Sequence, residues 1–132
     1  MDASLGDAKN DSVYVAQAAA KKLGCTAAVT GAVDVISDGV HTIKIENGHP
    51  MLARVTGTGC MASALAGAFA GACKGDYLTA AAAAVSAMGI AGEMAYAKAG
   101  NVGTASFRTA LIDALSTLGA QEFAQRSKID EV

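Results

Sequence analysis

Residues 55–60 read Val-Thr-Gly-Thr-Gly-Cys and lie between a predicted extended segment and an alanine-rich stretch of helical character. Two glycines one residue apart permit a tight turn and leave the backbone open to a ligand. The following helix would present unpaired N–H groups and the positive end of its dipole to that ligand. The stretch therefore predicts an anion site at Thr58 and Gly59, suited to a phosphoryl group. Cys60 falls in the first helical turn, where the dipole favours a thiolate.

The same residues also have a purely structural interpretation. A Gly-x-Gly before a helix is often only a turn, and a cysteine near a helix start is often a small buried apolar residue. The combination after a strand is the geometry that phosphate sites need, so both interpretations stay open. In the functional one, Cys60 is the candidate nucleophile or proton acceptor. Cys25 and Cys73 are expected to be packing residues.

Length and composition narrow the class of protein. A chain of 132 residues suits one compact unit, so residues 1–132 are predicted to form a single unit. Hydrophobic residues make up 52%, which is enough for a core and excludes a disordered tail. A net charge of −2 without a basic run argues against nucleic acid or an anionic membrane as partner. Three cysteines without Cys-x-x-Cys spacing predict reduced thiols in a cytoplasmic protein.

Targeting and membrane-spanning segments are not predicted. Residues 1–7 lack the basic start and apolar stretch of a secretory signal. The uncharged run Val55–Cys73 contains Gly67-x-x-x-Gly71, a spacing that lets helices approach closely in bilayers. Because its small and polar residues give little insertion energy, we expect close packing within a globular protein instead.

Before residue 55 the pattern predicts one helix followed by four strands. The helix is N-capped by Asp11 and Ser12 and stops at Gly24. The uncharged run 25–30 predicts a strand that is buried on both faces. Further strands are predicted at 33–37, 40–45 and 51–53. Asp38 and Gly39, between the second and third predicted strands, are a two-residue hairpin signal.

After residue 60 the pattern changes to helix. Gly89 and Gly92, inside the longest predicted helix, are expected to allow a close contact with another helix, or a kink. Because few buried strands are available, either the sheet is mostly antiparallel or the chain is part of a larger α/β unit. Helices are predicted at 60–73, 77–98, 106–118 and 121–126.

Four other polar residues are weaker candidates. Thr30 ends the uncharged strand, where ligands of α/β sheets collect, so its hydroxyl is a candidate nucleotide contact; a threonine that closes a turn is the alternative. His41 is expected to face solvent or to pack within a strand. His49 has no cysteine or carboxylate at metal-ligand spacing. Glu93 is expected to be a solvated or paired charge.

Three ordered blocks, Val29–Ile36, Asn47–Leu52 and Val55–Cys60, carry a family resemblance. Together they resemble hydroxyethylthiazole kinase, an enzyme of thiamine salvage with the ribokinase-like fold. The Gly-Thr-Gly-Cys block is shared with the related hydroxymethylpyrimidine kinases, whereas Thr-Gly-x-Val-Asp-Val-Ile and Asn-Gly-His-Pro favour the thiazole enzyme. The stretch from Gly103 to Leu115 is similar to the C-terminal helix of that family.

The resemblance runs over nearly the whole chain but matches only the C-terminal half of the family. It implies an α/β fold, the C-terminal part of a ribokinase-like three-layer architecture, with a short strand and hairpin region followed by several helices rich in small residues. It implies ATP-dependent phosphorylation of the hydroxyethyl group of 4-methyl-5-(2-hydroxyethyl)thiazole, with ATP and Mg²⁺, in a cytoplasmic homo-oligomer that is a trimer. The alternatives are a hydroxymethylpyrimidine kinase of the same fold and an inactive truncated fragment that only folds or oligomerises.

Site residues follow from the resemblance position by position. Cys60 matches the catalytic residue that takes the proton of the substrate hydroxyl. Gly57 matches a glycine that contacts the substrate, and Thr30 matches a threonine that contacts ATP. Thr58 and Gly59, with the Cys60 N–H, match the anion hole at the helix start. The acidic groups associated with Mg²⁺ belong to the other half of the family, so no metal ligand is expected in this chain.

Overall fold

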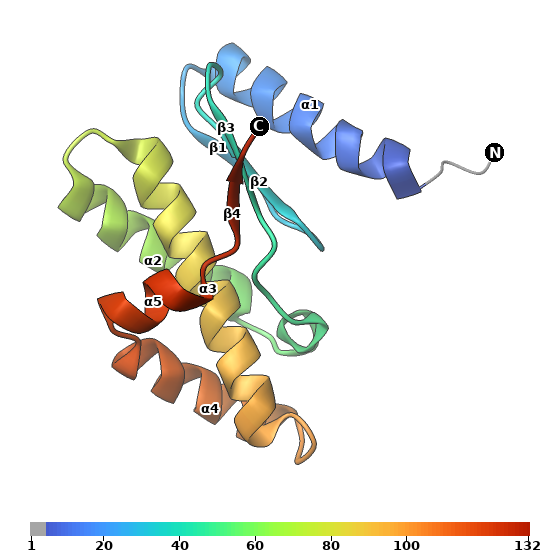
Figure 1. The fold of residues 1–132 in the computed structure, drawn as a ribbon, viewed down its shortest axis with the longest axis vertical. Coiled ribbons are helices and arrows are strands. Elements are labelled where there is room, and N and C mark those ends of the chain that lie inside the picture. The colour runs from blue at the N-terminus through green and yellow to red at the C-terminus, as the bar shows by residue number, and fades with distance from the viewer. Residues whose placement is uncertain (1–4) are drawn as a thin grey trace.

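The structure is a computed structural model that describes residues 5–132, and Figure 1 follows the chain from its blue N-terminal end to its red C-terminal end. One helix and three consecutive strands make up the first part, and helices dominate the second. The elements are α1 (Leu5–Leu23), β1 (Ala27–Val29), β2 (Asp34–Ser37), β3 (Thr42–Ile45), the 3₁₀ helix η1 (Pro50–Arg54), α2 (Thr58–Cys73), α3 (Tyr77–Ala99), α4 (Thr104–Thr117), α5 (Ala120–Arg126) and β4 (Ile129–Glu131).

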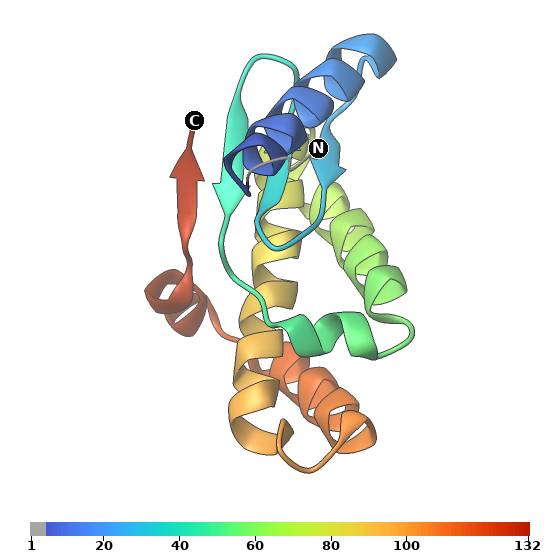
Figure 2. The same ribbon diagram turned by 90° about the vertical axis from the view of Figure 1, so that its right-hand side faces the viewer.

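An antiparallel sheet of four strands, in the order β1-β2-β3-β4, forms the middle layer. Successive side chains of a strand point to opposite faces. Ile36 of β2 pairs with Ile43 of β3, and both pack against α3. Val35 is buried on the other face, which α1 covers. Figures 1 and 2 show the resulting order of helix, sheet and helix, which confirms the predicted layered α/β class.

The core on the helical side is built around α3. Its small residues let α2 and α4 pack closely along it (Figure 2). Phe107 and Leu111 of α4 are fully buried against Ala91 and Ala95 of α3. Asp76 accepts a hydrogen bond from the Thr79 N–H at 3.1 Å and caps the start of α3. This packing fixes α3 as the element against which the other helices are placed.

One described helix, α3, is long and apolar enough to cross a membrane by length and composition, whereas the run singled out in the sequence forms the shorter α2. Within α3, 61% of the most apolar window is buried inside the fold. Burial on that scale is typical of the core helix of a globular protein.

The predicted N-terminal helix and first strand need correction. Helix α1 begins at Leu5, so Asp11 and Ser12 lie inside it and do not cap it. Such residues are favoured at caps but are tolerated inside a helix. The strand at 25–30 shortens to β1 and is not buried on both faces, because it lies at the edge of the sheet and Ala28 is exposed. Cys25 is likewise exposed rather than packed, while Cys73 is half-buried.

The hairpin between β2 and β3 is confirmed, but its loop is longer than predicted. Ser37 pairs with Thr42, so residues 38–41 form the connection. Asp38 accepts hydrogen bonds from the N–H groups of Val40 and His41, at 2.8 and 2.7 Å. Those bonds, first from His41 and then from Val40, lower the pKa of Asp38 to about 2. Exposed His41 therefore belongs to the loop, because the Asp38 carboxylate stabilises a wider turn than two residues allow.

The strand predicted at residues 51–53 is wrong, since this segment forms η1. Pro50 occupies the first turn of η1, and the His49 Nδ1 atom accepts a hydrogen bond from the Met51 N–H at 3.1 Å. Proline and a capping side chain favour a helical turn over a short strand. The sheet is completed instead by β4, which the sequence pattern does not predict and which pairs with β3. The four helices after residue 57 are confirmed with boundaries within two residues.

Candidate active site

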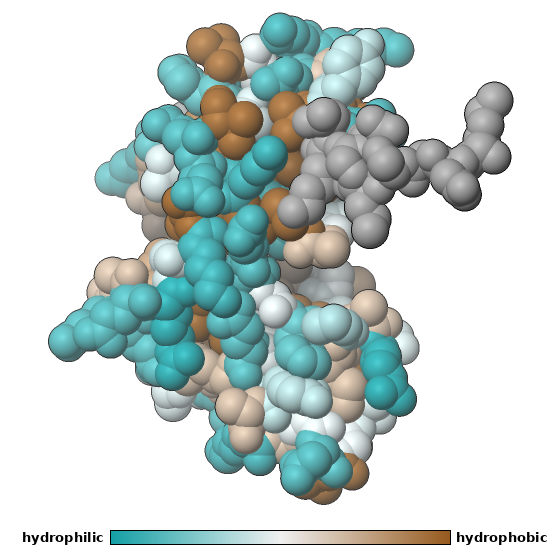
Figure 3. All heavy atoms as spheres, turned by 45° about the vertical axis from the view of Figure 1, so that its right-hand side comes forward, coloured by the Kyte–Doolittle hydropathy of each residue, from teal (hydrophilic) through white to brown (hydrophobic). Residues whose placement is uncertain are grey.

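A pocket of about 520 Å³ lies where the sheet meets η1, α2 and α3. Its volume is within the range of small-molecule sites, roughly 300–1,000 Å³. Figure 3 shows the molecular surface hollowed between the part that holds the sheet and the part that holds the helical core. The pocket is lined by residues 30–32, 34, 47–50, 52, 53, 58, 59, 62, 85, 88 and 89.

The start of α2 forms one corner of this pocket. Gly57 adopts the left-handed region at φ 99° and is the N-cap, and no side chain among residues 5–132 caps this end by a hydrogen bond. The first backbone bond into the helix runs from the Met61 N–H to the Gly57 carbonyl, at 3.0 Å. The N–H groups of residues 58–60 consequently have no acceptor within the helix. A Cβ built on Gly57 or Gly59 would meet nothing within 4 Å, so this corner is open.

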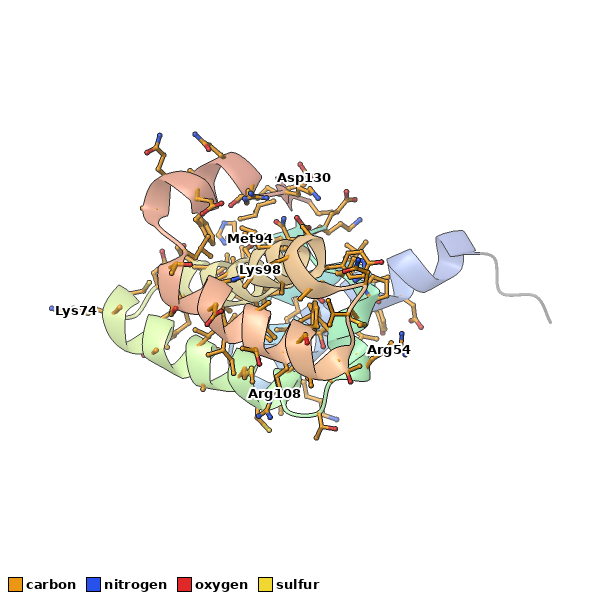
Figure 4. All side chains as sticks on the ribbon, turned by 90° about the horizontal axis from the view of Figure 1, so that it is seen from below. Arg54, Lys74, Met94, Lys98, Arg108 and Asp130 are labelled. Atoms are coloured by element: carbon orange, nitrogen blue, oxygen red, sulfur yellow. The ribbon has the colours of Figure 1, made fainter. Side chains whose placement is uncertain are left out.

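The side chain of Thr58 fixes the turn that leads into α2. Its Oγ1 lies 3.0 Å from the Leu52 carbonyl oxygen and 3.2 Å from that of Val55. The hydroxyl therefore ties α2 to the end of η1, while the Thr58 N–H stays available. Helix α2 then runs away from the pocket, and Figure 4 shows Lys74, after its far end, on the opposite side from Arg54 of η1.

The structure brings together most of the residues that the sequence singles out. Thr30, Thr58 and Gly59 line the same pocket, although Thr30 comes from a different segment of the chain. Gly57 and Cys60 flank the lining residues at the helix start and are not part of the lining. The Cys60 side chain is exposed, so it is not a buried apolar packing residue.

Sequence reasoning missed Asp34 and Asn47, which also line the pocket. Burial raises the pKa of Asp34, and a hydrogen bond from the Gly31 N–H, at 2.8 Å, opposes this effect. Asn47 is 4% exposed, and its side chain binds Arg126 far along the chain. Both residues lie in blocks that carry the family resemblance, but nothing in their spacing assigned them to a pocket, because the pocket is formed by contacts between distant segments.

His49, which the sequence did not favour, is a further part of the lining. Its ring stacks on Tyr96 of α3, with 3.6 Å between ring centroids and 19° between the planes. Its Nδ1 atom already accepts the Met51 N–H. The proton of a neutral imidazole is then on Nε2, which makes Nε2 a hydrogen-bond donor.

The pocket suits an anionic ligand better than a metal ion held by protein alone. The unpaired N–H groups at the start of α2 complement phosphate oxygens. Among the side chains that the structure describes, residues 11–132, there is no group of three histidine, cysteine, aspartate or glutamate residues that could hold a metal. Asp34 is the acidic side chain in the lining.

A bare glycine turn that enters a helix, at a pocket in a layered α/β fold, is an arrangement that suits a small anionic ligand. Comparison with known protein families identifies the family to which the chain belongs. The model of the hydroxyethylthiazole kinase family matches residues 1–121, and the chain belongs to this family.

Relatives and solved structures agree with the family assignment. The hydroxyethylthiazole kinase of Ruminiclostridium cellulolyticum is 55% identical over 133 residues, covering 100% of this chain and 48% of the relative. That of Clostridium beijerinckii is 49% identical over 135 residues, covering 100% of this chain and 49% of the relative. The structure of a hydroxyethylthiazole kinase protein from Pyrococcus horikoshii OT3 superposes with a TM-score of 0.87 at 40% identity, covering 95% of this chain and 48% of that one.

These comparisons confirm the ribokinase-like fold class and the resemblance on which it was predicted. The chain spans about half the length of the curated relatives that it matches.

Proposed function

We propose that this chain supplies the C-terminal half of an ATP-dependent kinase that phosphorylates the hydroxyethyl group of 4-methyl-5-(2-hydroxyethyl)thiazole in thiamine salvage. The observation that carries the proposal is the convergence of Thr30, Thr58 and Gly59 on one pocket, at a helix start whose N–H groups are free. Family membership gives the chemistry, because the relatives are named for this kinase activity.

Each site residue has a distinct task in this proposal. The N–H groups at residues 58–60 bind phosphate oxygens, and Gly59 has no Cβ to keep those oxygens away. Thr30 binds the nucleotide, and Gly57 lets the alcohol approach the backbone. Cys60, at the open end of α2, takes the proton of the substrate hydroxyl. ATP supplies the phosphoryl group, and the loose transition state makes positioning and charge neutralisation the larger contributions.

Mg²⁺ is expected with ATP, but the described residues do not form a protein cage for it. Magnesium is usually held by one or two carboxylates together with substrate phosphates and water.

We also propose that the protein acts in the cytoplasm as a homo-oligomer, a trimer by resemblance to the family. Helix α2 supports an association, because none of its residues is buried within the described structure. Its Ala- and Gly-rich surface allows another backbone to approach closely. Sedimentation equilibrium measures the assembly directly, and a chain that stays monomeric at all concentrations would contradict this part of the proposal.

Titration calorimetry tests the function with three ligands: ATP with Mg²⁺, the thiazole alcohol, and hydroxymethylpyrimidine. We expect binding of ATP and of the thiazole alcohol, together with formation of the thiazole phosphate. Preference for the pyrimidine would assign the related kinase of the same fold. Absence of binding to all three would identify an inactive fragment that only folds or oligomerises.

A further inference from the structure

The segment Asn47–His49 forms one wall of the pocket and connects β3 to η1. Gly48, in its middle, is exposed and adopts φ 145°. Asn47 is buried and His49 half-buried. A segment centred on a glycine has many accessible conformations, so other residues must hold this wall in one of them.

Glu93 of α3 supplies the contacts that hold it. Its Oε1 atom accepts hydrogen bonds from the Gly48 N–H at 3.0 Å and from the Asn47 Nδ2 at 3.3 Å. The same oxygen lies 3.2 Å from the Lys128 Nζ. The Glu93 side chain is 22% exposed, so solvent competes only in part for these bonds. Hydrogen bonds to a carboxylate are stronger than those between neutral groups.

Asn47 extends this cluster to the C-terminal segment. Its Nδ2 donates to the Arg126 carbonyl at 2.9 Å, and its Oδ1 accepts the Lys128 N–H at 2.8 Å. The segment then continues into β4, which pairs with β3 (Figure 4 labels Asp130 on this strand). The wall of the pocket is therefore held between α3 on one side and the C-terminal segment on the other.

We propose that Glu93 is a positioning residue, whose carboxylate holds Asn47–His49 in the conformation that receives the ligand. The proposal rests on the proposed function for the identity of that ligand. The ordered wall includes His49, whose Nε2 is left as a donor by the bond to the Met51 N–H. A donor in the lining suits an acceptor on the ligand, either a phosphoryl oxygen or the ring nitrogen of the thiazole. A wall ordered before binding improves affinity, because less conformational freedom is lost on binding.

The test compares Glu93→Ala and Glu93→Gln with Asp113→Asn in the full chain. The control is matched, because Asp113, like Glu93, pairs with a lysine. Its partner is Lys98 at 3.6 Å, and Asp113 lies on α4 outside the pocket lining. Amide hydrogen exchange of Gly48, followed by NMR, reports on the wall. Calorimetric titrations with Mg-ADP and with the thiazole alcohol are two separate arms, which show whether the phosphate or the ring is the group that is lost. Thermal unfolding of every variant corrects for general destabilisation.

We expect Glu93→Ala to speed exchange of the Gly48 amide by about tenfold and to lower the affinity for at least one of the two ligands by a similar factor. Glu93→Gln should recover part of both effects, because its amide oxygen still accepts the Gly48 N–H. Asp113→Asn should change neither. Unchanged exchange in Glu93→Ala would overturn the proposal, as would faster exchange with affinities no weaker than those of Asp113→Asn. If the wild type binds neither ligand, the proposed function fails, and the Gly48 exchange rate alone then decides whether Glu93 holds the wall.

Discussion

Gly89 of α3 and Asn47 approach so closely that a Cβ on Gly89 would lie 2.6 Å from the Asn47 carbonyl oxygen. The backbone of the pocket wall thus rests directly on the helix. One helical turn later, Glu93 binds the N–H of Gly48. The same face of α3 therefore positions this wall at two points. Gly89 has no Cβ and lets the wall backbone approach, and the Glu93 carboxylate binds that backbone. The close helix contact predicted at Gly89 is wrong in its partner, because Gly89 packs against the backbone of a loop and not against a helix.

Substituting Gly89 with alanine should destabilise the fold. The added Cβ would meet backbone atoms of Asn47, which cannot move without shifting the wall, so we expect a loss of about 1–3 kcal/mol. Gly92→Ala should cost less, because its Cβ would meet the end of the Leu52 side chain. Gly67→Ala, whose Cβ would meet nothing within 4 Å in this chain, is the control; at concentrations where the chain is monomeric it should stabilise the fold by about 0.5–1 kcal/mol. Urea unfolding measures all three, and equal effects at Gly89 and Gly67 would contradict the prediction.

Phe107 is the largest fully buried side chain and joins α4 to α3. Phe107→Ala should lower the free energy of unfolding by about 3–5 kcal/mol, since it leaves a cavity in that core. Ile112→Ala, five residues later on the exposed side of α4, should change stability by less than about 0.5 kcal/mol. Thermal and urea unfolding of the pair test the assignment, which a small loss at Phe107 would refute.

Cys60→Ala separates binding from proton transfer. Because Cys60 does not line the pocket, ATP affinity should stay within about twofold of the wild type, while turnover in a full-length enzyme falls by about 10²–10⁴-fold. Cys73→Ala is the matched control, since Cys73 lies at the other end of α2 and should leave both quantities unchanged. Steady-state kinetics and calorimetry give the two quantities; wild-type turnover in Cys60→Ala would remove the thiol from the mechanism.

Gly57→Val tests the shape of the helix start. A branched side chain at φ 99° is strained whatever space surrounds it, and the strain would displace the N–H groups that follow. We expect ATP affinity to fall by at least about tenfold, for a strain of order 1–3 kcal/mol. Gly119→Val, at the N-cap of α5 where φ is −90° and a Cβ would meet nothing within 4 Å, is the control. Equal affinities in the two variants would argue against phosphate binding at this corner.

The Glu93 cluster predicts a pH dependence of stability. Burial raises the pKa of Glu93, but hydrogen bonds from Gly48, Lys128 and Asn47, with the Lys128 charge, lower it to a net value below the ordinary 4.5. The stabilisation is therefore present above pH 4.5 and is lost as the pH falls through the lower folded-state pKa. The difference in urea midpoint between wild type and Glu93→Gln should be constant near neutral pH and shrink in acid. A difference that grows in acid would have the wrong sign.

Local patterns were sufficient for much of this fold. The alanine-rich runs after residue 57 have helical periodicity and clear breaks, so their helices could be predicted closely. The glycine turn before α2 likewise marked a pocket corner, because bare backbone at a helix start is a local property. Thr30 could be singled out as a pocket residue because it ends a predicted strand. These features depend on neighbouring residues, which a single sequence shows.

The features that were missed depend on distant residues. Strand β4 is only three exposed residues, and its pairing with β3 is what makes it a strand. The η1 segment is too short for periodicity, and the His49 cap decided its conformation. Glu93 was expected to be solvated or paired; it is paired, but its partners Gly48 and Asn47 are more than 40 positions away. Which charge meets which loop cannot be deduced from spacing alone.

Asn47 contacts residues 126 and 128 through their main-chain atoms, not through their side chains. The Asn47 contact itself therefore does not depend on which side chains stand at those two positions, although the Lys128 side chain separately pairs with Glu93. Position 47 has less freedom, because asparagine offers a donor and an acceptor on two separate atoms. Ionised aspartate has no donor, leucine has neither group, and serine has both only on one oxygen that is closer to the backbone. The C-terminal segment is therefore fastened to the pocket wall by its backbone, so a new side chain at residue 126 leaves the attachment in place.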